Sequence, residues 1–293
     1  STIKNAVKKR LISDVSIGVF LSGGIDSAII LQSLAEMGRK IPTYTIGFKD
    51  EVDYYNESEN AKKISNYYGF ENKTILLNSN KVKASINDVL DANDEPFADS
   101  SSIPTYMISE AVKNDIKVAL TGDGGDELFG GYRKYSAYKW TAIMKLLPDK
   151  FKKKIALTLP DSKNNFYLNN SRKLKRLLES YHSDFKKMQI NLLDQISKED
   201  FNELFGIKKK GPPNKLFKNT DTFDDPLNNV LARDFCFSLL GDMLVKLDRN
   251  SMANSLELRS PFLDKDLVEK SFNIPGKNKV GFFKGKKILK LSS

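Results

Sequence analysis

Two short glycine-rich segments hold the residues of this chain whose types and spacing suit chemistry. The first, S-G-G-I-D-S at residues 22–27, follows an apolar and β-branched run that predicts a buried strand. Its glycines, Gly23 and Gly24, reach backbone angles closed to other residues, so loop N–H groups can converge before the helix that follows. Because a helix N-terminus carries about half a positive charge, an anion is favoured there. The segment therefore predicts a phosphate-binding loop.

The aspartate of this loop indicates what a phosphate would need beside it. Asp26 stands where a Walker A loop would have its lysine, and neither the Walker spacing nor that lysine is present. A phosphate next to a carboxylate needs a cation, so we expect Mg2+ at Asp26. A plain strand-to-helix turn is the alternative, because the motif is short.

The second segment is T-G-D-G-G-D-E-L-F-G-G at residues 121–131, directly after a predicted strand at 116–120. It holds Asp123, Asp126 and Glu127, and carboxylates so close repel unless a cation or a cationic substrate lies among them. A solvated acidic turn is the alternative, whereas an EF-hand would spread its ligands over about twelve residues. Because both segments follow strands of one predicted sheet, we expect them to form one site.

The elements that must position these segments alternate along the first half of the chain. Apolar spacing predicts helices at 1–13, 27–37, 56–68, 80–90 and from Pro104, and strands at 15–21, 41–48, 73–77 and 116–120. Such alternation implies a parallel sheet with helices on both faces, and ligands bind beyond the carboxyl ends of its strands. From about Trp140 lysine-rich helical patterns follow. We therefore expect an α/β nucleotide-binding part at 1–145 and a mainly helical remainder of the same domain at 146–293.

Composition excludes several kinds of chemistry. The chain of 293 residues has one cysteine and one histidine. Cys236 lies in an apolar stretch and is expected to be buried and inert, and a single cysteine excludes disulfides and cysteine-based metal sites within the chain. His182 lies in a lysine-rich helical stretch and is expected at the surface. Ser/His/Asp and Cys/His catalysis therefore find no support.

Charge and hydropathy restrict the partners and the compartment. The net charge is +10, but the basic residues fall in short pairs and triplets, which is typical of a solvated surface. No apolar run approaches the roughly 20 residues that span a membrane. The apolar run after the basic first residues ends in the glycine loop, so no signal peptide is expected. We expect a cytoplasmic protein with no membrane partner and no specific nucleic-acid partner.

Four motifs in a fixed order resemble one protein family. They are S-G-G-I-D-S at 22–27, D-E-P-F-A-D-S-S-S-I-P-T-Y at 94–106, T-G-D-G-G-D-E-L-F-G-G-Y at 121–132, and L-V-K-L-D-R-N-S-M-A-N-S-L-E-L-R-S-P-F-L-D at 244–264. Together they resemble the synthetase domain of glutamine-dependent asparagine synthetase, from about Val7 to Lys290 and most weakly over 145–225. The resemblance implies an adenine nucleotide α-hydrolase-like fold of the ATP pyrophosphatase type, with an added helical C-terminal region.

The resemblance also implies a two-step reaction. The side-chain carboxylate of aspartate attacks the α-phosphate of ATP and gives β-aspartyl-AMP and pyrophosphate, and ammonia then displaces AMP to give asparagine. A glycine loop with Mg2+ suits this reaction, because cleavage between the α and β phosphates leaves negative charge on pyrophosphate. ATP as co-substrate and Mg2+ are therefore the expected ligands, with aspartate and ammonia as the other small molecules.

Matched by motif position, the resemblance assigns a role to each candidate site residue. Pyrophosphate would be held by Ser22, Gly23, Gly24, Asp26 and Ser27; adenine and ribose would meet Phe20, Leu21 and Ile46; and Thr121 with Gly122 would close over the nucleotide. Mg2+ would be bound by Asp26 and Asp126. The catalytic set would be Asp123, Asp126 and Glu127, in which Asp123 takes the acid/base or positioning role for the incoming amine.

The last motif holds a further group of closely alternating charges, at Lys246, Asp248, Arg249, Glu257, Arg259 and Asp264. They would form either an ion-pair network that ties the helical half to the sheet or a part of the site. The residue types alone leave both interpretations open.

The ends of the chain depart from the family pattern. Full-length members begin with a cysteine that hydrolyses glutamine in a separate N-terminal domain, whereas this chain begins at Ser1, just before the synthetase domain. Members also continue past I-L-K with a segment whose lysine contacts the phosphates, and Lys284, Lys286 and Lys287 lie before that segment. We therefore expect no glutaminase activity in this chain, the missing glutaminase domain as its partner, and little or no synthesis by the chain alone. Whether the chain forms a homodimer stays open.

Three other functions stay open at this stage. A β-lactam synthetase or another adenylating amidotransferase shares these loops and differs in the carboxylate that it activates. A nucleotide-sensing or scaffolding module would bind ATP or AMP without turnover. A basic nucleic-acid binder would show salt-dependent binding without sequence preference and without an effect of ATP.

Overall fold

A computed structural model describes residues 1–49, 57–95, 97, 99–160, 166–182, 185–193, 198–208, 221–282 and 284–292 of the chain. The chain forms two compact units. Unit 1 comprises Ser1–Phe129, Asp234–Ile274 and Ile288–Ser293, and unit 2 comprises Gly130–Arg233 and Pro275–Lys287. The units are interleaved along the chain, whereas the division expected near residue 145 is sequential.

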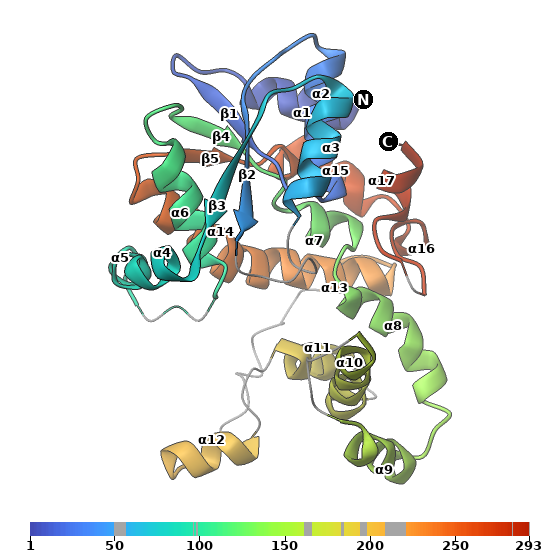
Figure 1. The fold of residues 1–293 in the computed structure, drawn as a ribbon. Helices are drawn as coiled ribbons and strands as arrows, with labels where there is room; N and C mark the ends of the chain where they lie inside the picture. Colours follow the sequence, from blue (N-terminus) through green and yellow to red (C-terminus); the bar gives the residue numbers. More distant parts are fainter. Residues whose placement is uncertain are drawn as a thin grey trace. The chain divides into compact units, whose positions relative to one another are not determined.

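Unit 1 is built on a five-stranded sheet whose strand order is β3-β2-β1-β4-β5 (Figure 1). The strands are β1 (Ile17–Phe20), β2 (Thr43–Phe48), β3 (Asn72–Leu77), β4 (Val118–Leu120) and β5 (Glu257–Arg259). All four pairings are parallel, and β1 lies directly beside β4, with Val19 opposite Leu120. The predicted α/β fold with a parallel sheet is confirmed, and the two glycine-rich loops leave neighbouring strands at the same edge.

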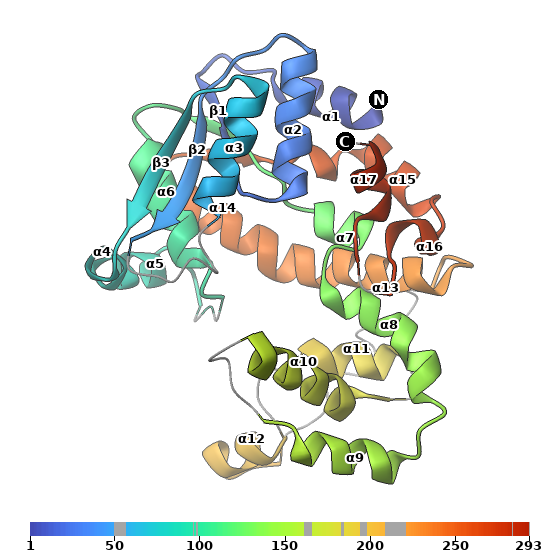
Figure 2. The same ribbon diagram turned by 45° about the vertical axis from the view of Figure 1, so that its right-hand side comes forward.

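Helices cover both faces of this sheet (Figure 2). On one face α1 (Thr2–Arg10) packs on α2 (Ile25–Glu36), α2 packs on α3 (Ser58–Tyr68), and α3 packs on β2. On the other face α6 (Ser102–Val112) contacts β2 and α14 (Leu244–Met252). A buried apolar cluster fills the space beneath α6; its members are Tyr44, Ile108, Val112, Ile116, Ala119 and Leu256. Burial of such side chains is the main stabilising term for a layered α/β fold.

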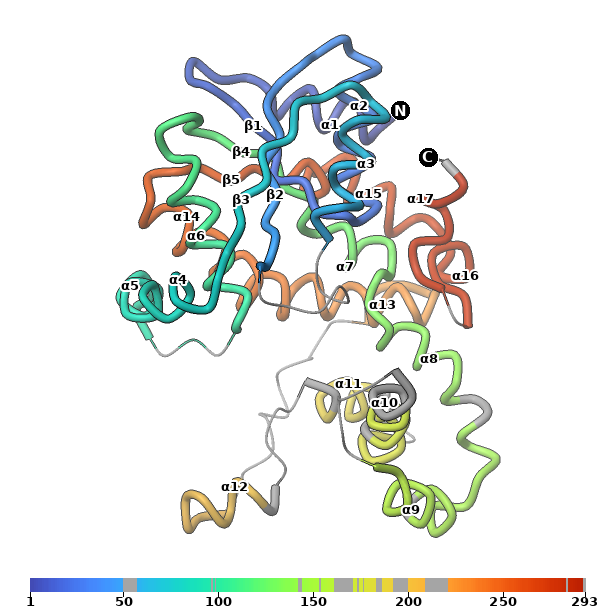
Figure 3. The backbone as a smooth tube through the Cα atoms, viewed as in Figure 1, coloured from blue at the N-terminus to red at the C-terminus, as the bar shows by residue number. Residues whose placement is uncertain are grey.

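Segments from distant parts of the sequence meet in this layer. Figure 3, coloured by residue number, shows α14 beside α6 in unit 1. β5, which pairs with β4, lies in the part of the chain expected to be mainly helical and was not predicted. It is three residues long, so it carries too little of the two-residue alternation that identifies a strand.

Short elements complete unit 1. They are α4 (Ser79–Ala84), α5 (Ile86–Asp91), α7 (Gly125–Phe129), a 3-10 helix at Pro261–Leu263, α15 (Lys265–Phe272), and most of α17 (Lys287–Ser292). The single helix predicted at 80–90 is wrong, because the chain turns at Ser85 between α4 and α5. The Ser85 hydroxyl donates to the carbonyl oxygen of Val82 at 3.0 Å, and such back-bonding competes with helix continuation.

Unit 2 is helical where the structure describes it, as the sequence predicted. Its helices are α8 (Arg133–Met144), α9 (Asp149–Thr158), α10 (Phe166–Ser180), α11 (Phe185–Leu193), α12 (Lys198–Phe205), α13 (Pro226–Asp234) and α16 (Gly276–Lys279). Met144, Ala156 and Leu178 form its apolar cluster. His182, expected at the surface, is half-buried. Among the described helices, none combines the length and the apolar character that a membrane crossing needs.

A π-helix at Phe235–Met243 follows α13 and leads directly into α14. Cys236 lies in it and is exposed, so the prediction that this thiol is buried is wrong. Of the residues in the π-helix, Leu239 is buried. The apolar neighbours of Cys236 suggested burial, but this stretch forms a π-helix, which bonds residue i to i+5 and leaves Cys236 exposed.

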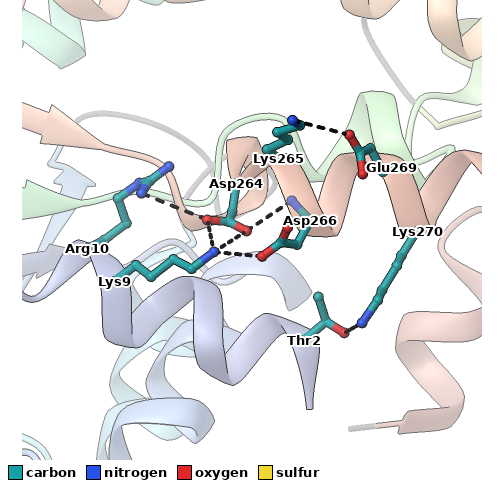
Figure 4. Close-up of polar contacts among 8 residues, drawn as sticks. All are labelled: Thr2, Lys9, Arg10, Asp264, Lys265, Asp266, Glu269 and Lys270. Carbon is teal, nitrogen blue, oxygen red and sulfur yellow. Dashed lines mark hydrogen bonds and ion pairs between the residues drawn. The ribbon is translucent and has the colours of Figure 1, made fainter.

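Ion pairs hold the N-terminal helix against the segment after β5 (Figure 4). Lys9 Nζ lies 3.1 Å from Asp264 Oδ2 and 2.7 Å from Asp266 Oδ2, and Arg10 lies 4.0 Å from Asp264. The Asp264 side chain also caps α15 by accepting from the backbone N–H of Asp266 at 3.2 Å. Asp264 is buried, so water screens its pairs with Lys9 and Arg10 less than it screens the exposed pair of Lys9 with Asp266.

Candidate functional site

The two glycine-rich loops are in direct contact through Asp26. A Cβ atom built on Gly125 would lie 2.6 Å from Asp26 Cγ, and one built on Gly122 would lie 3.0 Å from Asp26 Cβ and 3.2 Å from the backbone nitrogen of Ser27. Real Cβ atoms do not approach other atoms below 3.0 Å. The glycines of the second loop therefore let it pack on the first turn of α2, and the two loops form one surface.

Hydrogen bonds brace the first loop from inside. The Ser27 hydroxyl lies 3.0 Å from the Ser22 carbonyl oxygen and 3.1 Å from that of Gly24, and the Gly24 N–H donates to Ser22 Oγ at 3.2 Å. Ser27 is buried, so it supports the loop from below, whereas Ser22 is exposed at its rim. The residues predicted to hold pyrophosphate therefore lie together, with Ser22 to Gly24 in the loop before α2 and Asp26 and Ser27 in its first turn.

One bond of this loop was not predicted. The Gly23 N–H donates to Glu57 Oε2 at 3.2 Å, across a separation of 34 residues. Glu57 lies immediately before α3, inside the range 56–68 that the sequence predicted as a helix. Periodicity contains no signal for a contact between a side chain and a distant loop.

The two predicted Mg2+ ligands occupy equivalent places. Asp26 is the second residue of α2 and Asp126 the second residue of α7, and each helix follows one of the glycine loops. Asp26 is 8% exposed, with its carboxylate against Gly125. A carboxylate in the first turn is stabilised by the helix dipole. Within the described residues no group of three or more His, Cys, Asp or Glu side chains could hold a metal, so a bound Mg2+ would need ligand oxygens beside these carboxylates.

Asp123 has the electrostatic surroundings of an acid/base group. Burial raises the pKa of its carboxyl above the usual range, while a hydrogen bond from Thr121 and the positive charge of Lys246 act in the opposite direction. The Ser260 hydroxyl donates to the Asp123 carbonyl oxygen, and the Thr121 N–H donates to the next strand at the carbonyl oxygen of Arg259, at 3.0 Å. A carboxyl with a raised pKa and a fixed backbone suits proton transfer or amine positioning.

Lys246 connects two of the four sequence motifs. Its ammonium donates to Ser101 Oγ at 2.8 Å and lies 3.2 Å from Asp99 Oδ2, and its side chain is 7% exposed. Burial raises the pKa of Asp99, but hydrogen bonds from Ser101 and the charge of Lys246 outweigh burial and leave the pKa below its ordinary value. A buried lysine paired in this way is held in a fixed place beside the second loop.

The other charges of the last motif make structural contacts. Arg259 bonds Glu257 at 2.6 Å and donates to the backbone carbonyl oxygens of Arg10, the last residue of α1, and Ile12. Arg249 pairs with Asp94. Asp264 binds Lys9, as described above. These pairs tie the last motif to N-terminal segments of unit 1, and Lys246 also acts on Asp123.

The residues predicted to meet adenine and ribose lie on two faces of the sheet. Phe20 and Ile46 both pack against the apolar cluster beneath α6. Leu21 is 2% exposed, its N–H donates to Tyr44 O and its carbonyl oxygen accepts from Thr45 Oγ1, both at 2.8 Å. Since successive side chains of a strand point to opposite faces, Leu21 faces away from the other two. Their contacts with a nucleotide stay predictions.

Glu127, the third member of the predicted catalytic set, is 1% exposed. It belongs to α7 with Asp126, which is partly buried. A carboxylate buried to this degree is more suited to supporting the second loop than to meeting a substrate. Its catalytic role also stays a prediction.

Comparison with known proteins assigns the family. The family model described as asparagine synthase matches residues 1–292. This chain belongs to the asparagine synthase family, and the resemblance predicted from the four motifs is confirmed.

Several curated proteins are similar to the chain. A glutamine-hydrolyzing asparagine synthetase of Bacillus subtilis is 30% identical over 276 residues, covering 93% of this chain and 43% of that protein. The glutamine-hydrolyzing asparagine synthetase of Rattus norvegicus is 34% identical over 138 residues, which are 44% of this chain and 24% of that protein. Amidase chyE of Penicillium rubens is 25% identical over 308 residues, covering 92% of this chain and 44% of that protein. The chain thus spans less than half the length of these relatives.

Proposed function

We propose that this chain is the synthetase part of a glutamine-dependent asparagine synthetase, a ligase of asparagine biosynthesis. It would convert aspartate, ATP and ammonia to asparagine, AMP and pyrophosphate through β-aspartyl-AMP. The observation that carries the proposal is the contact between the two loops, in which Gly122 and Gly125 pack on Asp26. This contact joins an anion-binding loop and an acidic loop in one site, as an adenylating enzyme requires.

The first loop would bind the polyphosphate. Backbone N–H groups of Gly23 and Gly24 lie before α2, whose N-terminus attracts negative charge. Cleavage between the α and β phosphates transfers charge to the departing pyrophosphate, and donors fixed in advance stabilise that charge most strongly. The buried Ser27 hydroxyl, bonded to both ends of the loop, would keep these donors in place.

Asp26 and Asp126 would hold Mg2+ between the two loops. They fit this role because both stand in first helical turns at one sheet edge, and because Asp26 is held by the packing of Gly125. When bound, Mg2+ neutralises phosphate charge and orients the reacting phosphate. Without it, two carboxylates would oppose a polyphosphate, so we expect nucleotide binding to depend on the metal.

Asp123 would serve the amine side of the reaction. Its carboxylate can attract a substrate ammonium or accept a proton as ammonia attacks the activated carboxyl. Lys246, buried and paired with Asp99, would limit how far the pKa of Asp123 rises. In the longer relatives named glutamine-hydrolyzing, ammonia would come from a glutaminase domain, which is the partner proposed for this chain.

The first test of this function is nucleotide binding. Isothermal calorimetry should show that the chain binds ATP with Mg2+ and that Asp26→Ala weakens the binding by about 100-fold or more, because a fixed charge at a phosphate site is worth several kcal/mol. Asp88→Ala, at a carboxylate of α5 outside the two loops, is the matched control. No binding by the wild type, or equal binding by Asp26→Ala, would contradict the assignment.

The second test identifies the acceptor. Pyrophosphate release is followed with aspartate and with other carboxylates, in the presence of ATP, Mg2+ and ammonium, and the amide product is identified by mass spectrometry. Release with aspartate supports the proposal. If another carboxylate gives release and aspartate does not, the adenylating chemistry is supported and aspartate is not the substrate.

A further inference from the structure

Glu57 lies against the phosphate loop and is held there by close packing. A Cβ atom on Gly23 would lie 2.9 Å from Asn60 Cβ and 3.2 Å from Glu57 Cβ, so no side chain fits between the loop and the start of α3. The Gly23 N–H donates to Glu57 Oε2 at 3.2 Å. Glu57 does not cap its own helix with its side chain. Its carboxylate thus accepts a hydrogen bond from the loop and does not cap α3.

This bond uses a donor that a phosphate would need. The Gly23 N–H is one of the backbone groups that the proposed function assigns to pyrophosphate. A bond to a carboxylate is charge-assisted and roughly twice as strong as a bond between neutral groups. A phosphate oxygen that binds Gly23 must therefore displace a competitor of the same charge.

The charge of Glu57 adds to that of Asp26. Asp26 is buried in the first turn of α2, directly after the same loop. A free polyphosphate would meet both carboxylates, and repulsion between like charges is strong where water is partly excluded. A polyphosphate complexed with a divalent cation carries less charge, and its cation attracts the carboxylates.

We propose that Glu57 makes the phosphate loop selective for metal-complexed polyphosphate by competing with free anions for the Gly23 N–H. The inference rests on the proposed function, because it concerns the loop that would bind ATP. It assigns Glu57 a role in ligand selection that does not require contact with the reacting atoms.

Glu59 provides the matched control. It lies in the first turn of α3, is exposed like Glu57, and would contribute equally to a general effect of negative charge near this helix end. No described hydrogen bond joins it to the phosphate loop. Glu57→Gln and Glu59→Gln therefore remove the same charge from neighbouring places, and only the first changes the bond to Gly23.

The experiment measures the affinity of wild type, Glu57→Gln and Glu59→Gln for inorganic pyrophosphate and for ATP by calorimetry, with excess Mg2+ and with EDTA. We expect Glu57→Gln to bind metal-free pyrophosphate about tenfold more tightly than wild type, which corresponds to about 1.4 kcal/mol. For the Mg2+ complexes the change should stay within about threefold, as should every change in Glu59→Gln. Circular dichroism verifies that both variants fold.

Four results would overturn the inference. Equal changes in Glu57→Gln and Glu59→Gln would show a general charge effect, and weaker binding of Mg2+-ATP by Glu57→Gln would show that the carboxylate supports the ligand. If wild type binds Mg2+-ATP and the variants do not differ, the inference alone fails. If wild type binds neither ligand with Mg2+, the proposed function fails and the inference falls with it.

Discussion

Replacing Gly125 by alanine tests the contact on which the candidate site depends. The new Cβ atom would lie 2.6 Å from Asp26 Cγ, 2.8 Å from Oδ1 and 3.0 Å from Oδ2. Non-bonded carbon atoms attract best at about 3.5–4.0 Å, so the carboxyl group of Asp26 or the loop that carries Gly125 must move by about 1 Å. Asp26 is buried, and neither movement is free.

Two opposing effects determine how much Gly125→Ala changes the free energy of unfolding. Overpacking of a buried site costs about 1–3 kcal/mol. Alanine is a better helix former than glycine by about 0.8–1.0 kcal/mol, and this gain partly offsets the loss because Gly125 is the first residue of α7. We therefore expect Gly125→Ala to lower the free energy of unfolding by about 0.5–2 kcal/mol. Gly241→Ala is the control, since a Cβ atom there would meet no atom within 4 Å.

The effect on ligand binding should be larger than the effect on stability. A displacement of about 1 Å in a positioned group can reduce function by about 100-fold, and Asp26 is a proposed Mg2+ ligand that the new methyl group would contact. Calorimetry with Mg2+-ATP should show a loss between about tenfold and 100-fold in Gly125→Ala and none in Gly241→Ala.

A double mutant separates the contact from other causes. If Gly125→Ala acts by moving the Asp26 carboxylate, the variant that carries both Gly125→Ala and Asp26→Ala should bind Mg2+-ATP as Asp26→Ala does, because residues in contact do not contribute additively. A folded Gly125→Ala protein with wild-type affinity, or fully additive losses in the double mutant, would refute the reasoning.

Two further substitutions test single groups. Asp123→Asn should leave Mg2+-ATP affinity unchanged and slow amide formation from ammonium, because it keeps the size of the side chain and removes its charge; equal rates would leave Asp123 a structural role. Lys279 is fully buried, with Nζ 2.9 Å from Asn228 Oδ1, and burial lowers its pKa to about 7. The unfolded chain, with a lysine pKa of 10.5, binds more protons above pH 7, so the free energy of unfolding should rise between pH 7 and pH 10.5 by up to about 1.4 kcal/mol per unit. Lys279→Met should be more stable than wild type, most of all near pH 7, and urea titrations in which the difference does not change with pH would contradict this account.

Elements with a long apolar pattern could be predicted from the sequence. Strands β1 to β4 and helices α1 to α3 carry enough alternation or helical spacing to identify them, and their observed bounds lie within a few residues of the expected ones. β5 could not be predicted, because Glu257–Arg259 becomes a strand only by pairing with β4. A pattern read along one segment does not contain the partner that makes the segment a strand.

The same reason limits prediction of the site. Gly23 and Gly24 indicated an anion loop because glycine freedom is a local property, and the bounds of α2 agree with that interpretation. Two contacts of the site join residues that are far apart in the sequence: Gly23 bonds Glu57, 34 residues away, and Lys246 pairs with Asp99. The residue types alone did not decide whether Lys246 belongs to an ion-pair network or to the site. Cys236 was predicted wrongly because apolar neighbours in the sequence do not decide which side chains of a helix are buried, and in the π-helix here Leu239 is buried and Cys236 is exposed.

The four motifs contact one another in the folded chain, which their order in the sequence does not show. The motif at 22–27 contacts the motif at 121–132 where Asp26 meets Gly125. The motif at 94–106 contacts that at 244–264 through Asp99 and Lys246, and the Thr121 N–H and Asp123 carbonyl oxygen bond Arg259 and Ser260 of the same last motif.

Each motif therefore specifies one side of a contact whose other side lies in another motif. The glycines at 122 and 125 are required by an aspartate about 100 residues earlier, as the packing distances show. A substitution in one motif should for this reason be compensated by changes in its contact partner sooner than by changes next to it in the sequence, and the Gly125 and Asp26 double mutant measures this coupling directly.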